Sequence, residues 1–268
     1  MLVLTLKLAL PPALIAGASV AGRRWGPGFS GWVVALPLVS GPIVFFLALD
    51  QGTSFAAAAA HGSLMGAAGQ AAFCVAYGWS GRLGRWPAAL ALGAVGFAVG
   101  ALALGTAARL PLAPLVLILA GCVALALAAM PAPAAGGTPA SLGRWDIPCR
   151  MATGTIAVVA LTRAAPLLGP RYSGVLAAFP VVTSLLAVFA QRAQGSHQAN
   201  AVLRGLLLGM FSFVAFYAVL EISVERAGIA VGFAAASAAA LAVQALTAVL
   251  RRALGARVRS SSRHEREE

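Results

Sequence analysis

Long apolar runs separated by short charged clusters fill the chain from its first residues to about residue 250. The runs reach about 20 residues, the length that an α-helix needs to cross a hydrocarbon core of roughly 30 Å. The alternation of apolar and polar residues typical of β-strands is almost absent, which disfavours a membrane β-barrel. The pattern predicts an all-α, polytopic transmembrane helix bundle with about nine spans, at residues 2–21, 31–49, 55–78, 86–108, 112–130, 150–168, 174–191, 199–220 and 227–250.

The composition strengthens this prediction. Of the 268 residues, 60% are hydrophobic and only 10% are charged, whereas a soluble domain carries about 25% charged residues. The net charge of +12 would also fit a nucleic-acid-binding protein. The arginines cluster at the ends of apolar runs, however, so we interpret them as loop charges beside membrane lipids and expect no nucleic-acid partner.

The distribution of arginines also predicts the orientation. With the N-terminus outside, the cytoplasmic loops and tail hold 13 arginines and the outer loops hold four. This asymmetry places the C-terminus in the cytoplasm. The tail, residues 251–268, mixes arginine, glutamate and serine, and is predicted to be a disordered cytoplasmic segment near anionic headgroups. The tryptophans all fall at the predicted cytoplasmic ends of spans, as Trp25, Trp32, Trp79, Trp86 and Trp145.

The chain contains an internal repeat with an offset of 143 residues. The string G-P-G-F-S-G at 26–31 matches G-P-R-Y-S-G at 169–174, and the register holds without a gap over about 70 residues. The same offset pairs residues that become important below: Lys7 with Arg150, Pro37 with Pro180, Ser40 with Thr183, His61 with Arg204, and Gly66 with Gly209.

The offset divides the chain into two four-helix repeats, at 1–111 and 146–250, joined by a linker helix and a cytoplasmic loop at 112–145. Five spans separate equivalent points, which is an odd number, so the second repeat is predicted to be inverted. Inverted repeats are characteristic of many secondary transporters. Some channels and assembly proteins have them too.

Two short motifs recur in the two repeats, and a third stands only in the second. A basic residue stands early in the first helix of each, and the second helix begins with an aromatic residue followed two residues later by a glycine. Its central triplet is A-F-P at 178–180 and A-L-P at 35–37. The third helix begins with L-R at 203–204, where the first repeat has A-H at 60–61.

With these motifs each repeat resembles the small four-helix inner-membrane proteins of the GlpM type. The resemblance covers both repeats, but not the span at 112–130 or the tail. It implies a multi-pass protein of the bacterial inner (plasma) membrane and a connection with alginate production, without a settled molecular activity. Members with a single unit are similar to proteins that insert in both orientations and pair antiparallel, so this chain resembles a fused pair.

Four ionisable residues lie inside the predicted spans: Lys7, His61, Arg150 and Arg204. Such residues are costly in a membrane and are candidates for function. The first two fall near the outer face and the other two near the inner face, which predicts two cationic sites that favour a small anionic solute or a lipid headgroup. The alternatives are snorkelling of the long side chains to the interface and, for His61, a neutral imidazole hydrogen-bonded among the helices.

Prolines interrupt the second helix of each repeat, at Pro37 and at Pro180. Paired interruptions indicate a transport site, because a proline frees backbone groups that can face a cavity. The neighbouring Ser40 and Thr183 either line this site or bond to local carbonyls. The alternative is a plain kink. Glycines at helical spacing predict close helix packing, as Gly62, Gly66, Gly69, Gly205 and Gly209.

Several classes of chemistry are disfavoured. No Asp or Glu falls in the middle of a predicted span, which argues against proton- or cation-coupled transport and against metal transport. The sequence has no phosphate-binding loop, nucleophile–base pair or metal-ligand cluster, so we expect no enzyme activity, cofactor or bound metal. The leading hypothesis is a small-solute transporter with a preference for anions. The alternatives are an accessory or assembly protein for envelope polysaccharide and, third, a channel.

Overall fold

The computed structural model describes residues 2–37, 40–105, 110–131 and 178–264, with short pieces between 148 and 176. For residues 2–11, 14, 15 and 251–264 it describes the backbone alone. Within this part of the chain the elements are helices and turns: α1 (Leu2–Trp25), α2 (Pro27–Val34), α3 (Ser40–Gln51), α4 (Thr53–Ser80), η1 (Gly81–Leu83), α5 (Trp86–Gly105), α6 (Leu112–Ala129), α9 (Val181–Gln194) and α10 (Ser196–His264).

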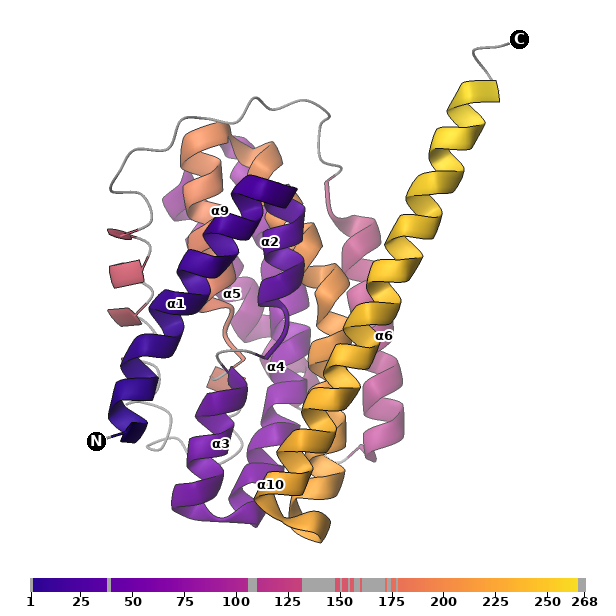
Figure 1. The fold of residues 1–268 in the computed structure, drawn as a ribbon. Helices are drawn as coiled ribbons and strands as arrows, with labels where there is room; N and C mark the ends of the chain where they lie inside the picture. The colour runs from indigo at the N-terminus through magenta and orange to yellow at the C-terminus, as the bar shows by residue number, and fades with distance from the viewer. Residues whose placement is uncertain are drawn as a thin grey trace.

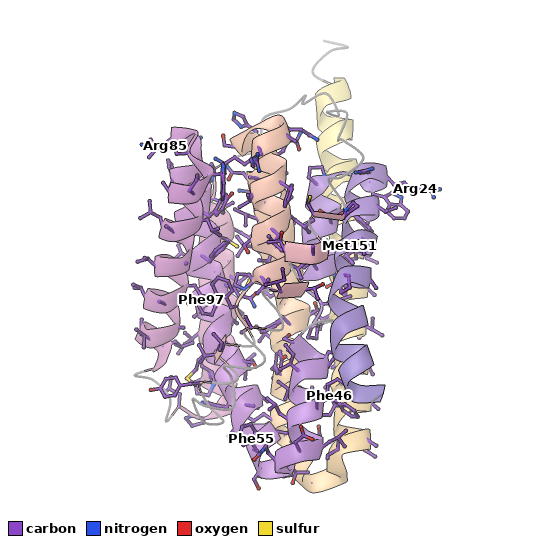
Figure 2. The ribbon with its side chains drawn as sticks, turned by 90° about the vertical axis from the view of Figure 1, so that its left-hand side faces the viewer. Arg24, Phe46, Phe55, Arg85, Phe97 and Met151 are labelled. Atoms are coloured by element: carbon purple, nitrogen blue, oxygen red, sulfur yellow. The ribbon has the colours of Figure 1, made fainter. Side chains whose placement is uncertain are left out.

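The helices lie side by side in an upright bundle (Figure 1). The N-terminus lies at the same end as the connection between α3 and α4, and the C-terminus lies at the opposite end. We call these the lower and the upper end, as in Figure 1. Figure 2 shows Arg24 and Arg85 at the upper end and Phe55 at the lower end.

Glycines with positive φ produce the sharp reversals. Gly52 (φ 91°) precedes α4 and Gly195 (φ 87°) precedes α10. These two glycines are 143 residues apart, which is the offset of the repeat. Gly228 (φ 80°) divides α10 into two helical segments, 196–227 and 229–264, and Figure 1 shows the second segment returning upward. Only glycine adopts such conformations without a steric cost.

Both predicted helix interruptions occur at the expected prolines. Helix α2 ends at Val34 and α3 begins at Ser40, with Pro37 in the non-helical segment between them. Pro180 stands directly before α9. At each proline the carbonyl accepts a 2.8 Å hydrogen bond from the backbone N–H four residues later, at Gly41 and at Ser184. Each proline therefore stands just before the start of a helix, and at Pro37 a second helix, α2, lies before the break.

Helix α4 and the first segment of α10 form the centre of the bundle. Their largest fully buried side chains are Leu64, Met65, Phe73 and Tyr77 on α4 and Leu203, Leu207, Met210, Tyr217 and Leu220 on α10. Helices α5 and α6 lie outside them and expose apolar side chains, including Leu92, Val95, Val99, Leu102, Leu117, Ile118 and Leu125. An apolar outer surface around a partly polar centre is the arrangement expected in lipid.

Three helices in the described part are long and apolar enough to cross a membrane: Trp86–Gly105, Leu112–Ala129 and Ser196–Leu250. The all-α class is therefore confirmed there, together with apolar helices of membrane-spanning length. Most of the predicted span 150–168 lies outside the described residues, and so do most side chains of the predicted span 2–21. The other predicted spans differ for physical reasons. The breaks at Pro37 and Pro180 leave α2, α3 and α9 too short to cross alone. Helix α4 is long enough to cross a membrane, but it is less apolar than the other three helices, because it contains polar residues such as the buried Ser63 and Gln70.

The tail differs from the expectation of disorder, since the backbone of α10 is helical to His264. The segment 251–258 is rich in arginine and alanine, which have high helix propensity. It therefore continues the hydrogen-bonded ladder of the preceding turns.

Arginines stack on tryptophans at the upper end. The guanidinium carbon lies 5.3 Å from the ring centroid for Arg24 and Trp25, 4.8 Å for Arg82 and Trp79, and 5.8 Å for Arg192 and Trp86. Each pair places a positive charge beside an amphipathic ring, a combination typical of residues at a membrane–water interface.

Candidate functional site

Arg204 lies in the upper half of the first segment of α10 and is half-buried. Its Nη1 donates hydrogen bonds to the carbonyl oxygens of Leu127 (3.1 Å) and Met130 (3.0 Å). The indole Nε1 of Trp79 donates to the carbonyl of Ala129 (2.9 Å). These carbonyls end helix α6, where the last four have no helical partner, and a cation also interacts favourably with the helix dipole there. Arg204 thus holds the upper end of the linker helix.

His61 on α4 contacts Glu221 on α10 at the lower end. The imidazole Nδ1 lies 2.9 Å from the carboxylate Oε1, and the side chains are 17% and 22% exposed. The other carboxylate oxygen, Oε2, is buried and accepts no hydrogen bond from the described residues. The contact joins the first predicted repeat to the second.

The repeat offset relates the surroundings of these two cations. It carries His61 onto Arg204, and Gly78 onto Glu221. Arg204 therefore has a glycine where His61 has a carboxylate. A Cβ placed on Gly78 would lie 2.8 Å from the Met130 sulfur and 3.2 Å from the Asn200 side-chain oxygen. The side chain of Met130 occupies the space that a carboxylate would need.

The break at Pro37 faces a cluster of hydroxyl groups. The Tyr217 side chain is fully buried, and its hydroxyl interacts with those of Ser40 and Ser63. The Tyr217 hydroxyl makes no hydrogen bond of standard geometry within the described residues. Ser63 donates to the carbonyl of Ala59 (3.0 Å). The predicted site residue Ser40 is thus brought beside two polar groups that the sequence analysis did not single out.

The break at Pro180 faces an amide. The side-chain Nε2 of Gln70, which is buried on α4, donates to the carbonyl of Ala178. Thr183 and Ser184 are buried at the start of α9, where the Ser184 hydroxyl bonds to the carbonyl of Val181 (2.8 Å). The interruption therefore exposes a backbone carbonyl that a polar side chain of the other predicted repeat satisfies.

Two of the predicted cationic candidates have side chains outside the described set. Lys7 lies on α1 with only its backbone described, and Arg150 lies outside the described residues. Among the residues that the structure does describe, no group of three or more His, Cys, Asp or Glu side chains is placed to hold a metal ion.

Glycines bring the two predicted repeats into close contact. A Cβ on Gly66 would overlap the side chain of Ala178, and a Cβ on Gly209 would overlap that of Ala35. Both members of the first pair are 143 residues from their counterparts in the second. Gly205 likewise lies against the carbonyl of Gly28. The predicted close packing is confirmed at these glycines.

Sequence reasoning missed Glu221, Tyr217, Ser63 and Gln70. A usable signal was present for three of them, since Tyr217, Ser63 and Gln70 are polar residues inside otherwise apolar runs. Glu221 stands seven residues before the Gly228 reversal, and His61 stands eight residues after the start of α4. Both are about two helical turns from the lower end.

Comparison with known proteins finds no relative. No protein family, no curated protein and no solved structure matches the chain.

Proposed function

We propose that the chain is a bacterial inner-membrane protein of about nine spans, built from two inverted four-helix repeats around the linker helix α6, with its N-terminus outside. The reciprocal packing of Gly66 on Ala178 and of Gly209 on Ala35 supports this proposal. A two-fold relation requires that if residue i of one unit contacts residue j of the other, then j contacts i as well. The paired glycine reversals at Gly52 and Gly195 are further support.

On this architecture we propose a small-solute transporter whose site lies between the two broken helices. One observation carries the proposal: both proline breaks face buried polar side chains, with Ser40, Ser63 and Tyr217 at the first and Gln70 and Thr183 at the second. Broken helices that meet near the middle of the membrane supply binding groups in many transporters. A buried hydroxyl costs free energy in an apolar bundle unless it is hydrogen-bonded, and the Tyr217 hydroxyl has no hydrogen-bond partner among the described residues.

These groups favour a small, polar, uncharged solute over the anion expected from the sequence. Arg204 is bonded to the carbonyls of α6, and His61 is in contact with Glu221. None of the charged side chains in the described part is fully buried. A preference for anions would now depend on Lys7 and Arg150.

The experiment is uptake by the full chain in vesicles of phosphatidylethanolamine and phosphatidylglycerol, with labelled neutral polyols, amides and small anions as probes. Tyr217→Phe removes one hydroxyl from the site, and we expect uptake of the transported probe to fall about tenfold, the effect of losing one buried hydrogen bond of about 1.4 kcal/mol. Tyr172→Phe, at a tyrosine 57% exposed, is the matched control and should leave uptake unchanged. If the unmodified protein moves no probe, the transporter proposal is wrong.

A second candidate function is an accessory protein for envelope polysaccharide of the alginate kind, as the GlpM-type resemblance implies. The close contact of Gly31 with the Val202 carbonyl and of Gly205 with the Gly28 carbonyl favours it, because a tightly packed interface leaves little room for movement. Deletion of the gene should then reduce secreted polysaccharide while the purified protein moves no solute. Solute uptake together with unchanged polysaccharide would exclude this candidate.

A further inference from the structure

Polar side chains form a path from the lower end of the bundle to the break at Pro37. The path begins at the His61–Glu221 contact between α4 and α10. Tyr217 lies four residues before Glu221 and therefore on the same face of α10, one turn deeper in the bundle. Its hydroxyl interacts with those of Ser63 on α4 and Ser40 at the start of α3. The path thus ends beside the broken helix.

The Glu221 carboxylate has one satisfied oxygen and one unsatisfied oxygen. Oε1 lies 2.9 Å from the imidazole of His61, while the buried Oε2 accepts no hydrogen bond from the described residues. A buried carboxylate oxygen without a donor is unfavourable. A proton bound to Oε2 removes the charge and turns this oxygen into a donor. The geometry therefore supplies a place for a proton.

We propose that the His61–Glu221 pair is a proton-binding site that couples the movement of solute to a proton gradient. The coupling rests on the proposed transport function, whereas proton binding by the pair does not. One proton is bound as the Glu221 carboxylate becomes a carboxylic acid, and the same proton is released when the carboxylate forms again. No oxidation or reduction is involved.

Protonation has a mechanical consequence at this site. When the imidazole carries a proton it attracts the carboxylate, and this attraction is lost when the carboxylate itself becomes neutral. Since His61 and Glu221 join α4 to α10 across the two repeats, proton uptake weakens their contact at the lower end. The path of polar side chains beside Tyr217 then becomes accessible from the lower end, while Arg204 continues to hold α6 at the upper end.

The other titratable groups on the packed elements are few. Asp50 on α3, and Glu225 and Arg226 on α10, are exposed at the lower end. Tyr217 lies one turn deeper, and Cys74 on α4 and Cys122 on α6 lie further along their helices. Within the described residues α2 and α5 carry no titratable side chain, and Arg82 in η1 and Arg192 on α9 lie toward the upper end.

Proton binding is tested first, without any solute. The full chain in vesicles of phosphatidylethanolamine and phosphatidylglycerol is brought from alkaline to acidic pH, and infrared difference spectra record the carbonyl band of newly formed carboxylic acid. We expect Glu221→Gln to remove one component of this band and His61→Gln to shift the pH at which it forms. Glu225→Gln, at the exposed glutamate one turn away, is the matched control and should remove only a component with the behaviour of a solvent-exposed carboxyl group.

Coupling is tested second, with the probe solute found in the uptake panel. An inward proton gradient should raise its accumulation in the unmodified protein, and Glu221→Gln should reduce this gain about tenfold, within the usual range of coupling between two sites. Exchange of the probe between preloaded vesicles and medium should persist in Glu221→Gln, which also shows that this variant is folded. Glu221→Asp should recover part of the gain.

The outcomes separate the two proposals. If no probe crosses but Glu221→Gln removes a buried-carboxyl component, the transport function is wrong and the proton site stands. If probes cross with no dependence on the gradient, or if the infrared band is the same in Glu221→Gln as in the unmodified protein, the proton-coupling inference is wrong and transport stands.

Discussion

His61 and Arg204 occupy the same position in the two predicted repeats, yet their surroundings differ. At the lower end the imidazole contacts the carboxylate of Glu221 across the two repeats. At the upper end the guanidinium bonds to the last carbonyls of α6, and the counterpart of Glu221 is Gly78. The two ends therefore differ in the groups that their cations contact: a carboxylate at the lower end and backbone carbonyls at the upper end.

The difference has a structural cause in helix α6. This helix has no counterpart in the predicted repeat, and its C-terminal end lies at the upper end of the bundle, beside Arg204. Trp79 and Arg204 satisfy its terminal carbonyls, and the side chain of Met130 lies over Gly78. Arg204 therefore bonds to backbone carbonyls at the upper end, whereas two titratable side chains meet at the lower end, where we propose that a proton binds.

The largest expected effect follows removal of the Arg204 hydrogen bonds. Arg204→Met leaves the carbonyls of Leu127 and Met130 without their donor, and we expect the free energy of unfolding to fall by about 3 kcal/mol, as for two lost charge-assisted hydrogen bonds. Unfolding in mixed detergent micelles, followed by circular dichroism, measures it. Arg226→Met, at an exposed arginine of the same helix, is the control and should change stability little. Equal stability in the two variants would contradict the role of Arg204 in holding α6.

A second change tests why the upper end has no carboxylate. Gly78→Glu places an acid where the repeat offset puts the counterpart of Glu221, but its Cβ meets the Met130 sulfur. We expect a loss of about 2 kcal/mol from overpacking. Met130→Ala in the same chain should recover at least half of it, because the space beside residue 78 is then free. A strictly additive double variant would show that Met130 does not fill this space.

The fold was predictable where the signal is local. Apolar runs give the helices, and Pro37 and Pro180 give the breaks, because a proline disrupts its own helix whatever surrounds it. The offset also predicted that Gly66 and Gly209 are equivalent. It could not predict that they face Ala178 and Ala35, since that depends on which helices of the two repeats lie together.

The candidate site was less predictable for the same reason. His61 and Glu221 are 160 residues apart, and their contact depends on the packing of α4 against α10. The partners of Arg204 left no trace in the sequence, because they are backbone carbonyls and every residue has one. An intramembrane cation could therefore be recognised as important, but its partner and its role could not.

The smallest expected effect is at the contact that the proton is proposed to break. His61→Gln and Glu221→Gln should each lower the free energy of unfolding near neutral pH by about 1 kcal/mol, as for a partly exposed ion pair. Because each change already removes the contact, the double variant should lose much less than the sum of the two, with a coupling of about 1 kcal/mol in a double-mutant cycle. In acid, where Glu221 is protonated, this coupling should disappear. Additive losses at neutral pH would mean that the two side chains do not hold α4 to α10, and the contrast between the two ends of the bundle would then rest on Arg204 alone.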